Sequence, residues 1–496
     1  AENPTNFKPH KSYTRPLYAI SSVTITLFHV LPIINQTIKM KKNSLTLILV
    51  FIISISGYSQ NFEKEFDLLL NKKYVASGPG ATALVAINGK VIYQKAFGKA
   101  NLELDVNMSL NNVFEIGSIS KQFTAVSILM LVEQGKLKLD DDITKYIKDY
   151  PTHGHSITIH HLLSHTSGIG SFTSSDEWYD NRKKDFTQKE LINLFKKLPM
   201  PHAPGERYLY SNTGYFLLAA VIEEISNKTY EEFIREYIFK PLEMNHTDYG
   251  SRSKIILNRA SGYDNVNDKG DEKFNKNETV NAEPISFIHW HSAGAIVSTV
   301  HDLFLWNRAI RNNKLISEEN KIKAFTNYQL KDGKHTNYGY GWAIEDINGT
   351  SSIEHSGGTF GFRCNSIYLP KEDVFVVVLS NQTYNAPDYV SAKMAAIAIN
   401  KPYQEIDTNK VNTDPAFLQK IVGTYEFDDG SVIIISEENN ELYSQRPNRS
   451  KSRIYSIEKN RFYFINSFSN LTFDVNKEPS VIYENRTYKS KGVKVK

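Results

Sequence analysis

The stretch "FEIGSISKQFTAV" (114–126) places Ser118 and Lys121 three residues apart at the start of a long apolar run. On a helix, residues i and i+3 share one face, so the Lys121 amine can reach the Ser118 hydroxyl. The helix N-terminus favours a negative oxygen, and the dipole and partial burial there lower a lysine pKa. The pair is therefore a candidate nucleophile and base. The alternative is a helix-capping serine beside a solvated lysine.

The Ser-x-x-Lys pattern occurs at two further places, so the context has to separate them. Ser251 and Lys254 precede a short mixed run. Ser456 and Lys459 lie in a β-rich region, where this spacing puts the two side chains on opposite faces of a strand. Only Ser118 opens a long apolar helix, and the sequence therefore favours Ser118 as the nucleophile.

A second candidate motif is Tyr210-x-Asn212, within "PGERYLYSNTGYFLLAAV" (204–221). It lies between a Pro-Gly break and a helix start, where a loop can present side chains to a cleft. A tyrosine there can pass a proton between nucleophile and leaving group, and an asparagine can bind a substrate carbonyl. The alternative is a core tyrosine followed by a capping asparagine.

A third motif, His355-Ser356-Gly357-Gly358, precedes an alternating strand in "IEHSGGTFGFRCNSIYLP" (353–370). Glycines in or beside a strand allow another backbone or a ligand to approach closely. An exposed N–H there, together with the N–H of Ser118, would form a two-donor oxyanion hole, in which one lost donor costs about 10²–10³ in rate. The alternative is a turn with a surface histidine.

The order of predicted elements indicates the fold. Asn88-Gly89 between two apolar runs predicts a type I′ hairpin. Further strands are predicted late in the domain, at 362–370 and 373–382. Strands at both ends with helices between them predict an α/β fold of the α+β type, with an antiparallel sheet flanked by helices and an all-α subdomain. Helices are predicted at 62–71, 120–135, 214–226, 229–242 and 297–312, the second ending near Gly135 and the last with Ser298 or Thr299 as N-cap.

The composition changes near Pro402. The polar segment 406–417 is interpreted as a linker. From 418 on, seven short strand-like runs separated by turn signals predict a small all-β, barrel-like domain over 418–496.

The N-terminal region has the features of a targeting segment. Met40 is followed by two lysines, an apolar stretch over 45–55 and small residues before Gln60, which is the layout of a secretory signal peptide over 40–59. A membrane anchor is the alternative, although the stretch is shorter than the about 20 residues of a membrane span. Residues 1–39 are interpreted as a non-native or mistranslated leader, and 60–405 as the main domain.

The charge balance argues against a nucleic-acid partner. The chain carries 58 basic and 54 acidic residues, but residues 1–59 hold six of the basic and one of the acidic ones. The remainder has a net charge of −1, so the basic pI of the whole chain comes from residues 1–59.

The single cysteine, Cys364, excludes an intramolecular disulfide and is expected in the core. Histidines at 153, 155, 160, 161, 165, 289 and 291 leave a zinc enzyme as a rival, although carboxylates in a metallo-hydrolase arrangement are missing nearby. His165 is expected to brace a turn beside the site, and no metal or other cofactor is predicted.

Taken together, Ser118-x-x-Lys121, Tyr210-x-Asn212 and His355-Ser356-Gly357 resemble, in this order, the class C β-lactamase-related serine hydrolases. That family includes penicillin-binding DD-peptidases, class C β-lactamases, D-aminopeptidases and esterases. The resemblance covers roughly 62–400, and the β domain resembles the lipocalin-like tails of some members. The other matching stretches are "ITIHHLLSHTSGI" (157–169), "SAGAIVSTVHDL" (292–303), "YGYGW" (338–342) and "EHSGGTFGF" (354–362).

The resemblance implies a role for each motif residue. Ser118 would be the acylated nucleophile, Lys121 its base partner and Tyr210 a second proton carrier. Asn212 would hold the substrate amide or the lysine. The N–H groups of Ser118 and Gly358 would form the oxyanion hole, and His355, Ser356 and Gly357 would contact the substrate.

One position departs from the family pattern. β-Lactamases and DD-peptidases of this kind have Lys-Thr-Gly where this chain has His355-Ser356-Gly357, and that lysine helps to bind a substrate carboxylate and keeps the tyrosine pKa low. A histidine is charged only part of the time at neutral pH. We therefore expect a secreted, periplasmic or extracellular peptidase or esterase with a small-molecule or peptide substrate, and not an efficient β-lactamase. The alternative is a catalytically weak penicillin-binding or sensor protein on the same fold.

Overall fold

The computed structural model describes residues 62–265, 278–404, 414–428, 430–439, 441–447, 451–476 and 478–496. The proposed leader (1–39), signal peptide (40–59) and most of the linker (406–417) lie outside the described residues. Residues 61–496 form one compact unit.

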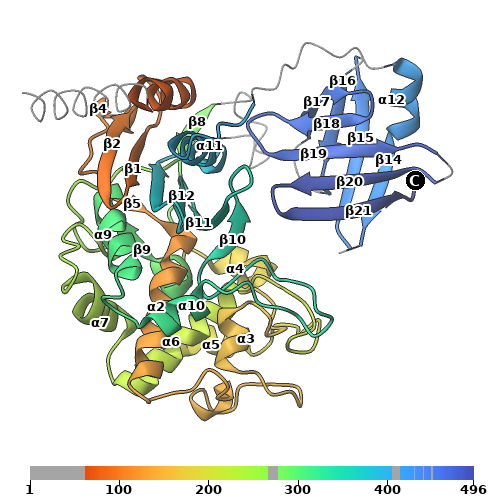
Figure 1. The fold of residues 1–496 in the computed structure, drawn as a ribbon. Helices are drawn as coiled ribbons and strands as arrows, with labels where there is room; N and C mark the ends of the chain where they lie inside the picture. The colour runs from red at the N-terminus through yellow and green to blue at the C-terminus, as the bar shows by residue number, and fades with distance from the viewer. Residues whose placement is uncertain are drawn as a thin grey trace, which may run out of the picture. The chain divides into compact units, whose positions relative to one another are not determined.

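A six-stranded antiparallel sheet organises the larger part of the chain (Figure 1). Its strand order is β10-β11-β12-β13-β1-β2, so the first strand pairs with the last one, with Ala81 opposite Ser380. This confirms the predicted antiparallel sheet built from both ends of the domain. The strands are β1 (Ala81–Ile87), β2 (Lys90–Phe97), β10 (Ala343–Asp346), β11 (Ser351–Thr359), β12 (Phe362–Leu369) and β13 (Val374–Ser380).

The hairpin between β1 and β2 turns at Asn88 and Gly89, which have φ angles of 51° and 70°. A type I′ turn needs positive φ at both central residues, and asparagine followed by glycine meets this need at low cost. The prediction from the Asn-Gly pair is confirmed.

Helices cover both faces of the sheet. α11 (Asp388–Ala398) and the helix over 62–73 pack on one face, and α9 (Val300–Arg311) packs on the other. β13 shows the consequence: alternate residues of this strand belong to two separate cores, so its whole length is apolar. This explains why its sequence lacks the polar-apolar alternation of a half-exposed strand.

The segment between β2 and β10 forms the mostly helical part. Two predicted helices agree closely with the structure: Thr299 caps α9, and the 214–226 pattern belongs to α6 (Asn212–Ser226), which begins two residues earlier. The predicted 229–242 helix is divided into α7 (Tyr230–Ile234) and a π-helical turn (Arg235–Phe239). The other helices are α2 (Ser120–Glu133), α3 (Ile159–Leu163), α4 (Asp176–Asn181), α5 (Gln188–Phe195), α8 (His291–Gly294) and α10 (Glu318–Ala324). Short strands β3 (Lys99–Asn101), β4 (Val106–Asn107), β5 (Phe114–Glu115), β6 (Asp248–Tyr249), β7 (Tyr263–Asn265), β8 (Thr279–Asn281) and β9 (Ile296–Ser298) connect them.

The C-terminal part is a closed eight-stranded barrel. The sequence predicted seven of its strands but not β21, whose sequence YKSKGVK carries only one large apolar residue besides its tyrosine. The helix α12 (Pro415–Ile421), which crosses the predicted boundary at 418, was also not predicted. The strands are β14 (Gly423–Phe427), β15 (Val432–Glu438), β16 (Glu441–Gln445), β17 (Ser452–Glu458), β18 (Arg461–Phe464), β19 (Ser469–Asp474), β20 (Ser480–Asn485) and β21 (Tyr488–Lys494).

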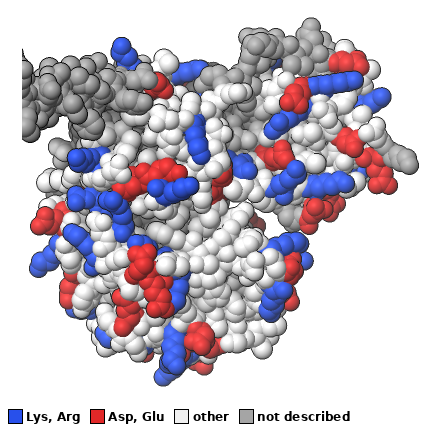
Figure 2. Space-filling view, viewed as in Figure 1, with Lys and Arg blue, Asp and Glu red and all other residues white. Residues whose placement is uncertain are grey.

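The surface carries both signs of charge. On the face shown in Figure 2, Lys and Arg side chains are interspersed with Asp and Glu, and neither sign forms a continuous patch. This agrees with the nearly balanced charge after residue 59. Within the described part of the chain, no helix is both long and apolar enough to cross a membrane.

Candidate active site

Ser118 lies in a short 3-10 turn (Gly117–Ile119) that leads directly into α2. The N-cap residues of this turn and of α2 are Ile116 and Ile119, without side-chain capping hydrogen bonds, so the alternative of a helix-capping Ser118 is not supported. The turn presents the serine half-exposed, while its neighbours Gly117 and Ile119 are buried. Gly117 has a φ of 51°, which suits glycine.

Lys121 is fully buried in the first turn of α2 and its amine is surrounded by oxygen atoms. Its Nζ lies 3.1 Å from Ser118 Oγ, 2.8 Å from Asn212 Oδ1 and 2.8 Å from the Ala293 carbonyl oxygen. None of these three groups is a carboxylate. Burial without a charged partner lowers the pKa of Lys121 well below its ordinary value.

The three oxygen atoms also fix how a neutral Lys121 amine is oriented. A neutral amine has two N–H bonds and one lone pair. The amide oxygens of Asn212 and Ala293 can only accept hydrogen bonds, so they take the two N–H bonds. The lone pair is then left for the Ser118 hydroxyl, which can donate its proton. This arrangement lets Lys121 act as a general base toward Ser118.

Tyr210 completes the group around Ser118. The Lys121 amine lies 4.8 Å from the centre of the Tyr210 ring. Burial raises the pKa of Tyr210, and a hydrogen bond with Ser118 only partly opposes this effect. Tyr210 is therefore a neutral phenol, able to donate and accept a proton but not held as a phenolate.

His165 supports the loop that carries Tyr210, as the sequence predicted. Its ring lies 4.2 Å from the Tyr210 ring, centre to centre, and its Nδ1 accepts the N–H of Ser211 at 3.1 Å. Burial lowers the pKa of His165 well below its ordinary value, so the ring stays neutral and the Tyr210 loop keeps this hydrogen bond at neutral pH.

β11 runs along the Ser118 turn at very short distance. A Cβ on Gly357 would lie 1.9 Å from the Ile116 carbonyl oxygen, so only glycine fits there. A Cβ on Gly117 would lie 2.5 Å from the backbone nitrogen of Gly358. The pairing of β10 with β11 ends at Glu354, so Gly357 and Gly358, further along β11, are not paired with β10. The backbone nitrogens of Ser118 and Gly358 are thus brought to the same place.

His355 is buried and forms two hydrogen bonds. Its Nδ1 lies 2.6 Å from the Ser356 carbonyl oxygen and must donate, so its Nε2 accepts from the Tyr338 hydroxyl at 2.9 Å. Burial, aided by the nearby Lys121 charge, lowers the pKa of His355 to about 3. The ring is neutral at physiological pH, and His355 therefore does not supply the positive charge of the family's lysine. Ser356 is exposed.

The hydrogen bond between Ser118 and Lys121 distinguishes this pair from the other two Ser-x-x-Lys copies. Ser251 lies on the exposed surface and accepts from the Lys254 backbone, while the Lys254 amine pairs with Asp248. Ser456 donates to the Glu458 carbonyl. Neither copy brings hydroxyl and amine together in a hydrogen bond.

Three groups of the site carried no role in the sequence prediction: the Ala293 carbonyl, Tyr338 and Thr173. The first two lie in stretches that match the family, "SAGAIVSTVHDL" and "YGYGW", but the match does not say which atoms act. Thr173 Oγ1 accepts from Asn212 Nδ2 at 3.1 Å, which orients the amide oxygen toward Lys121. A threonine in a loop gives no sequence signal for such a contact.

The histidines that left a zinc enzyme as an alternative have other hydrogen-bond partners in the structure. His160 pairs with Tyr340, His161 with the Thr158 backbone, and His291 with Tyr249 and Gln188. Among the described residues, no group of three or more His, Cys, Asp or Glu is placed to hold a metal ion. Cys364 is buried and donates to the Glu115 carbonyl, as expected for a core residue.

Comparisons with known proteins agree with this geometry. The family model described as "Beta-lactamase" matches residues 71–401. Penicillin-binding protein 4* of Bacillus subtilis is 30% identical over 427 residues, which cover 82% of this chain and 92% of that protein. The octameric penicillin-binding protein homologue from Pyrococcus abyssi superimposes with a TM-score of 0.62 at 25% identity, over 86% of this chain and 99% of that one. A D-amino acid amidase from Ochrobactrum anthropi shares the fold, with a TM-score of 0.59 at 22% identity over 69% and 99% of the two chains.

Proposed function

The chain belongs to the β-lactamase family of serine hydrolases, and from this premise we propose that it cleaves an amide or ester through an acyl-enzyme on Ser118. The observation that supports the proposal most strongly is the buried Lys121 amine, which lies 3.1 Å from Ser118 Oγ and has only neutral partners.

The geometry supports the following acylation step. The neutral Lys121 amine takes the Ser118 proton while Oγ attacks the substrate carbonyl carbon. The N–H groups of Ser118 and Gly358 stabilise the negative charge on the carbonyl oxygen. The bond to the leaving group then breaks, and the leaving group takes a proton from Tyr210, which the Lys121 ammonium reprotonates, so that Lys121 is neutral again.

Deacylation uses the same groups in reverse. A water molecule takes the place of the leaving group, and as its oxygen attacks the acyl carbon its proton passes to the neutral Lys121 amine, directly or through Tyr210. Ser118 regains its proton from the Lys121 ammonium when the ester bond breaks. Asn212 holds Lys121 in place in both steps through its amide oxygen.

The substrate class follows from His355. In members with Lys-Thr-Gly, the lysine binds a substrate carboxylate, whereas His355 is neutral and already bonded to Tyr338 and Ser356. We therefore favour a peptidase or esterase over an efficient β-lactamase. A catalytically weak penicillin-binding or sensor protein is the second candidate, favoured only by this missing charge.

The domain division is part of the proposal: a hydrolase domain over 60–405, a linker over 406–417 and a barrel over 418–496. We also propose secretion, on the basis of the signal-peptide pattern at 40–59. For the hydrolase domain we propose a small-molecule or peptide substrate.

Intact-protein and peptide mass spectrometry tests this function. After incubation with a fluorophosphonate, we expect one adduct on Ser118 in the wild type and in the matched control Ser456→Ala, and none in Ser118→Ala. With penicillin we expect a slow or weak adduct. Absence of any Ser118 adduct with the fluorophosphonate would contradict the proposal, and rapid turnover of penicillin would contradict the substrate class.

A further inference from the structure

The turn between β20 and β21 contains an arginine in an unfavourable backbone conformation. Arg486 has a φ of 46°, in the left-handed region that glycine and asparagine adopt much more readily. Hairpin turns do not need an arginine, so its side chain must have another use. Strained residues of this kind mark places where the surrounding structure or a function requires them.

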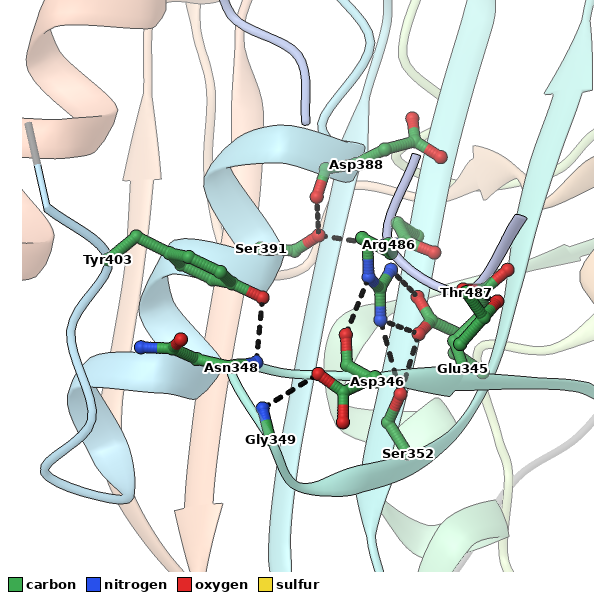
Figure 3. A network of polar contacts seen from close by, with 12 residues as sticks. Glu345, Asp346, Asn348, Gly349, Ser352, Asp388, Ser391, Tyr403, Arg486 and Thr487 are labelled. Atoms are coloured by element: carbon green, nitrogen blue, oxygen red, sulfur yellow. Dashed lines mark hydrogen bonds and ion pairs between the residues drawn. The ribbon is translucent and has the colours of Figure 1, made fainter. Parts of the chain in front are cut away.

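The side chain of Arg486 reaches from the barrel to the hydrolase sheet (Figure 3). Its Nε donates to the Asp346 carbonyl at 2.7 Å, and Nη2 donates to Ser352 Oγ at 3.2 Å. Both terminal nitrogens contact the Glu354 carboxylate, one of them at 3.0 Å. Next to it, Thr487 donates to Glu345 at 2.7 Å. Arg486 and Glu354 are both largely buried, so this is a fixed ion pair.

A second contact fixes the barrel at the same edge. Phe468, from the loop between β18 and β19, packs against Tyr389 and Tyr403 of the hydrolase part, with ring centres 4.8 Å and 4.5 Å apart. The barrel is therefore held by an aromatic contact as well as by an ion pair. Glu354 directly precedes His355 on β11, so the ion pair is attached to the strand that forms the active site.

The contacts border an open cavity of about 760 Å³ between the barrel and the active site. On the hydrolase side, Tyr210, His355 and Ser356 line it, and on the barrel side Asn485 and Tyr488. Neither Ser118 nor Gly358 is among the described residues that line it. The cavity thus opens beside Tyr210, the proposed proton donor to the leaving group, and away from the proposed oxyanion hole.

The cavity continues toward the barrel mouth. A second cavity of about 630 Å³ shares Ser467, Asn485 and Tyr488 with the first. Its lining combines six serines, Arg446, Asn485 and two tyrosines with four apolar side chains, Phe427, Ile433, Phe464 and Leu471. Polar and aromatic walls of this kind suit a chain of peptide groups better than an alkyl chain.

We propose that the barrel supplies the binding site for the leaving group of the substrate, and that this group is polar and peptide-like. The inference rests on the proposed function. Tyr488 forms the wall shared by both cavities, and Arg486 holds that wall in place.

A pair of esters with one acyl group tests the proposal. The two substrates are p-nitrophenyl acetate and N-acetyl-Gly-Ser-Gly-amide whose serine hydroxyl carries an acetyl ester. Both give the same acetyl-enzyme on Ser118, so their kcat/KM values differ only through the leaving group, which is p-nitrophenol or the peptide. We expect the ratio of kcat/KM, peptide ester over p-nitrophenyl acetate, to fall about tenfold or more in Tyr488→Ala and in Arg486→Asn. Asparagine suits the positive φ of the turn, so Arg486→Asn removes the guanidinium without adding strain.

Two barrel variants serve as matched controls. Arg453→Asn removes an exposed arginine paired with Glu441, and Tyr455→Ala removes a tyrosine from the same strand; both should leave the ratio unchanged. A ratio that stays unchanged in Tyr488→Ala and Arg486→Asn, or a wild type that cleaves the peptide ester no faster than Tyr488→Ala, would overturn the inference. A failure of the fluorophosphonate to label Ser118 would instead overturn the proposed function.

Discussion

Lys121 and Arg486 are both buried basic side chains, but they have opposite kinds of partners. Lys121 contacts a hydroxyl, an amide and a carbonyl, and its pKa is lowered well below the ordinary value. Burial also acts to lower the pKa of Arg486, but the Glu354 carboxylate outweighs burial and the pKa is raised. The same loss of water thus gives a base at one site and a permanent ion pair at the other, depending on whether a carboxylate is present.

Removal of the Lys121 amine is expected to have the largest effect. Lys121→Met keeps the length of the side chain but has no proton acceptor for Ser118. We expect kcat/KM for p-nitrophenyl acetate to fall by about 10³–10⁴, the upper range for a general base. The exposed Lys254 of the second Ser-x-x-Lys copy provides the control, since Lys254→Met should retain wild-type activity. A Lys121→Met variant with activity within tenfold of the wild type would remove Lys121 from the mechanism.

Removal of the arginine tests the other half of the comparison through stability. Arg486→Asn leaves the Glu354 carboxylate buried without its partner, which should lower the free energy of unfolding by about 3 kcal/mol. The double variant Arg486→Asn/Glu354→Gln removes both charges and should recover most of this loss. Urea unfolding measures both values. A double variant no more stable than Arg486→Asn would show that the ion pair is not the source of the effect.

The two sites could be predicted from the sequence to different degrees. Ser118, Lys121, Tyr210 and Asn212 lie in ordered motifs, because catalysis fixes residue types at fixed spacing, and the structure brings all four together. The contact of Arg486 has no motif, since it depends on a turn that joins residues more than 130 positions apart.

In the fold, too, some elements carry a local sequence signal and others do not. Local signals such as Asn88-Gly89 and the apolar β13 predicted four strands of the sheet, but β10 was not predicted, and the His355–Gly358 motif, expected before a strand, lies within β11. Strand β21, with three lysines in seven residues, gave no apolar alternation because the barrel pairs it through its backbone. The state of His355 could not be read from the sequence either, since its pKa depends on burial that only the folded chain provides.

A carboxylate placed beside Lys121 should raise its pKa, as the Glu354 carboxylate does for Arg486. Asn212→Asp puts a negative charge at the position of the amide oxygen 2.8 Å from Nζ. An opposite charge this close raises a lysine pKa by about 1–3 units, so activity near pH 7 should fall, by up to about 1000-fold. The loss should disappear at higher pH, where Lys121 becomes neutral again. Asn212→Ala, in contrast, should lose activity without a shift of the pH profile; equal profiles for both variants would contradict the account.

The smallest expected effect concerns His355 and the pH dependence of stability. His355 is a buried base whose pKa is lowered to about 3. The unfolded chain binds a proton near pH 6.5 while the folded one does not, so stability is complete above that pH and is lost as the pH falls toward 3. Between pH 7.5 and 5 this amounts to about 2 kcal/mol. Denaturant unfolding of His355→Gln should show a weaker pH dependence by this amount. The exposed His246 provides the control, and a wild-type slope in His355→Gln would contradict the burial argument.

The pH dependence of Ser118 labelling tests the central claim most directly. The rate of fluorophosphonate reaction, followed by mass spectrometry and corrected for reagent hydrolysis, reports the fraction of protein in which Lys121 is neutral. We predict that the rate rises with pH and reaches its plateau well below 10.5, the ordinary lysine value, and that Asn212→Asp moves this rise to higher pH. A rate that increases only above pH 10.5, or that does not depend on pH, would contradict the assignment of Lys121 as the base for Ser118.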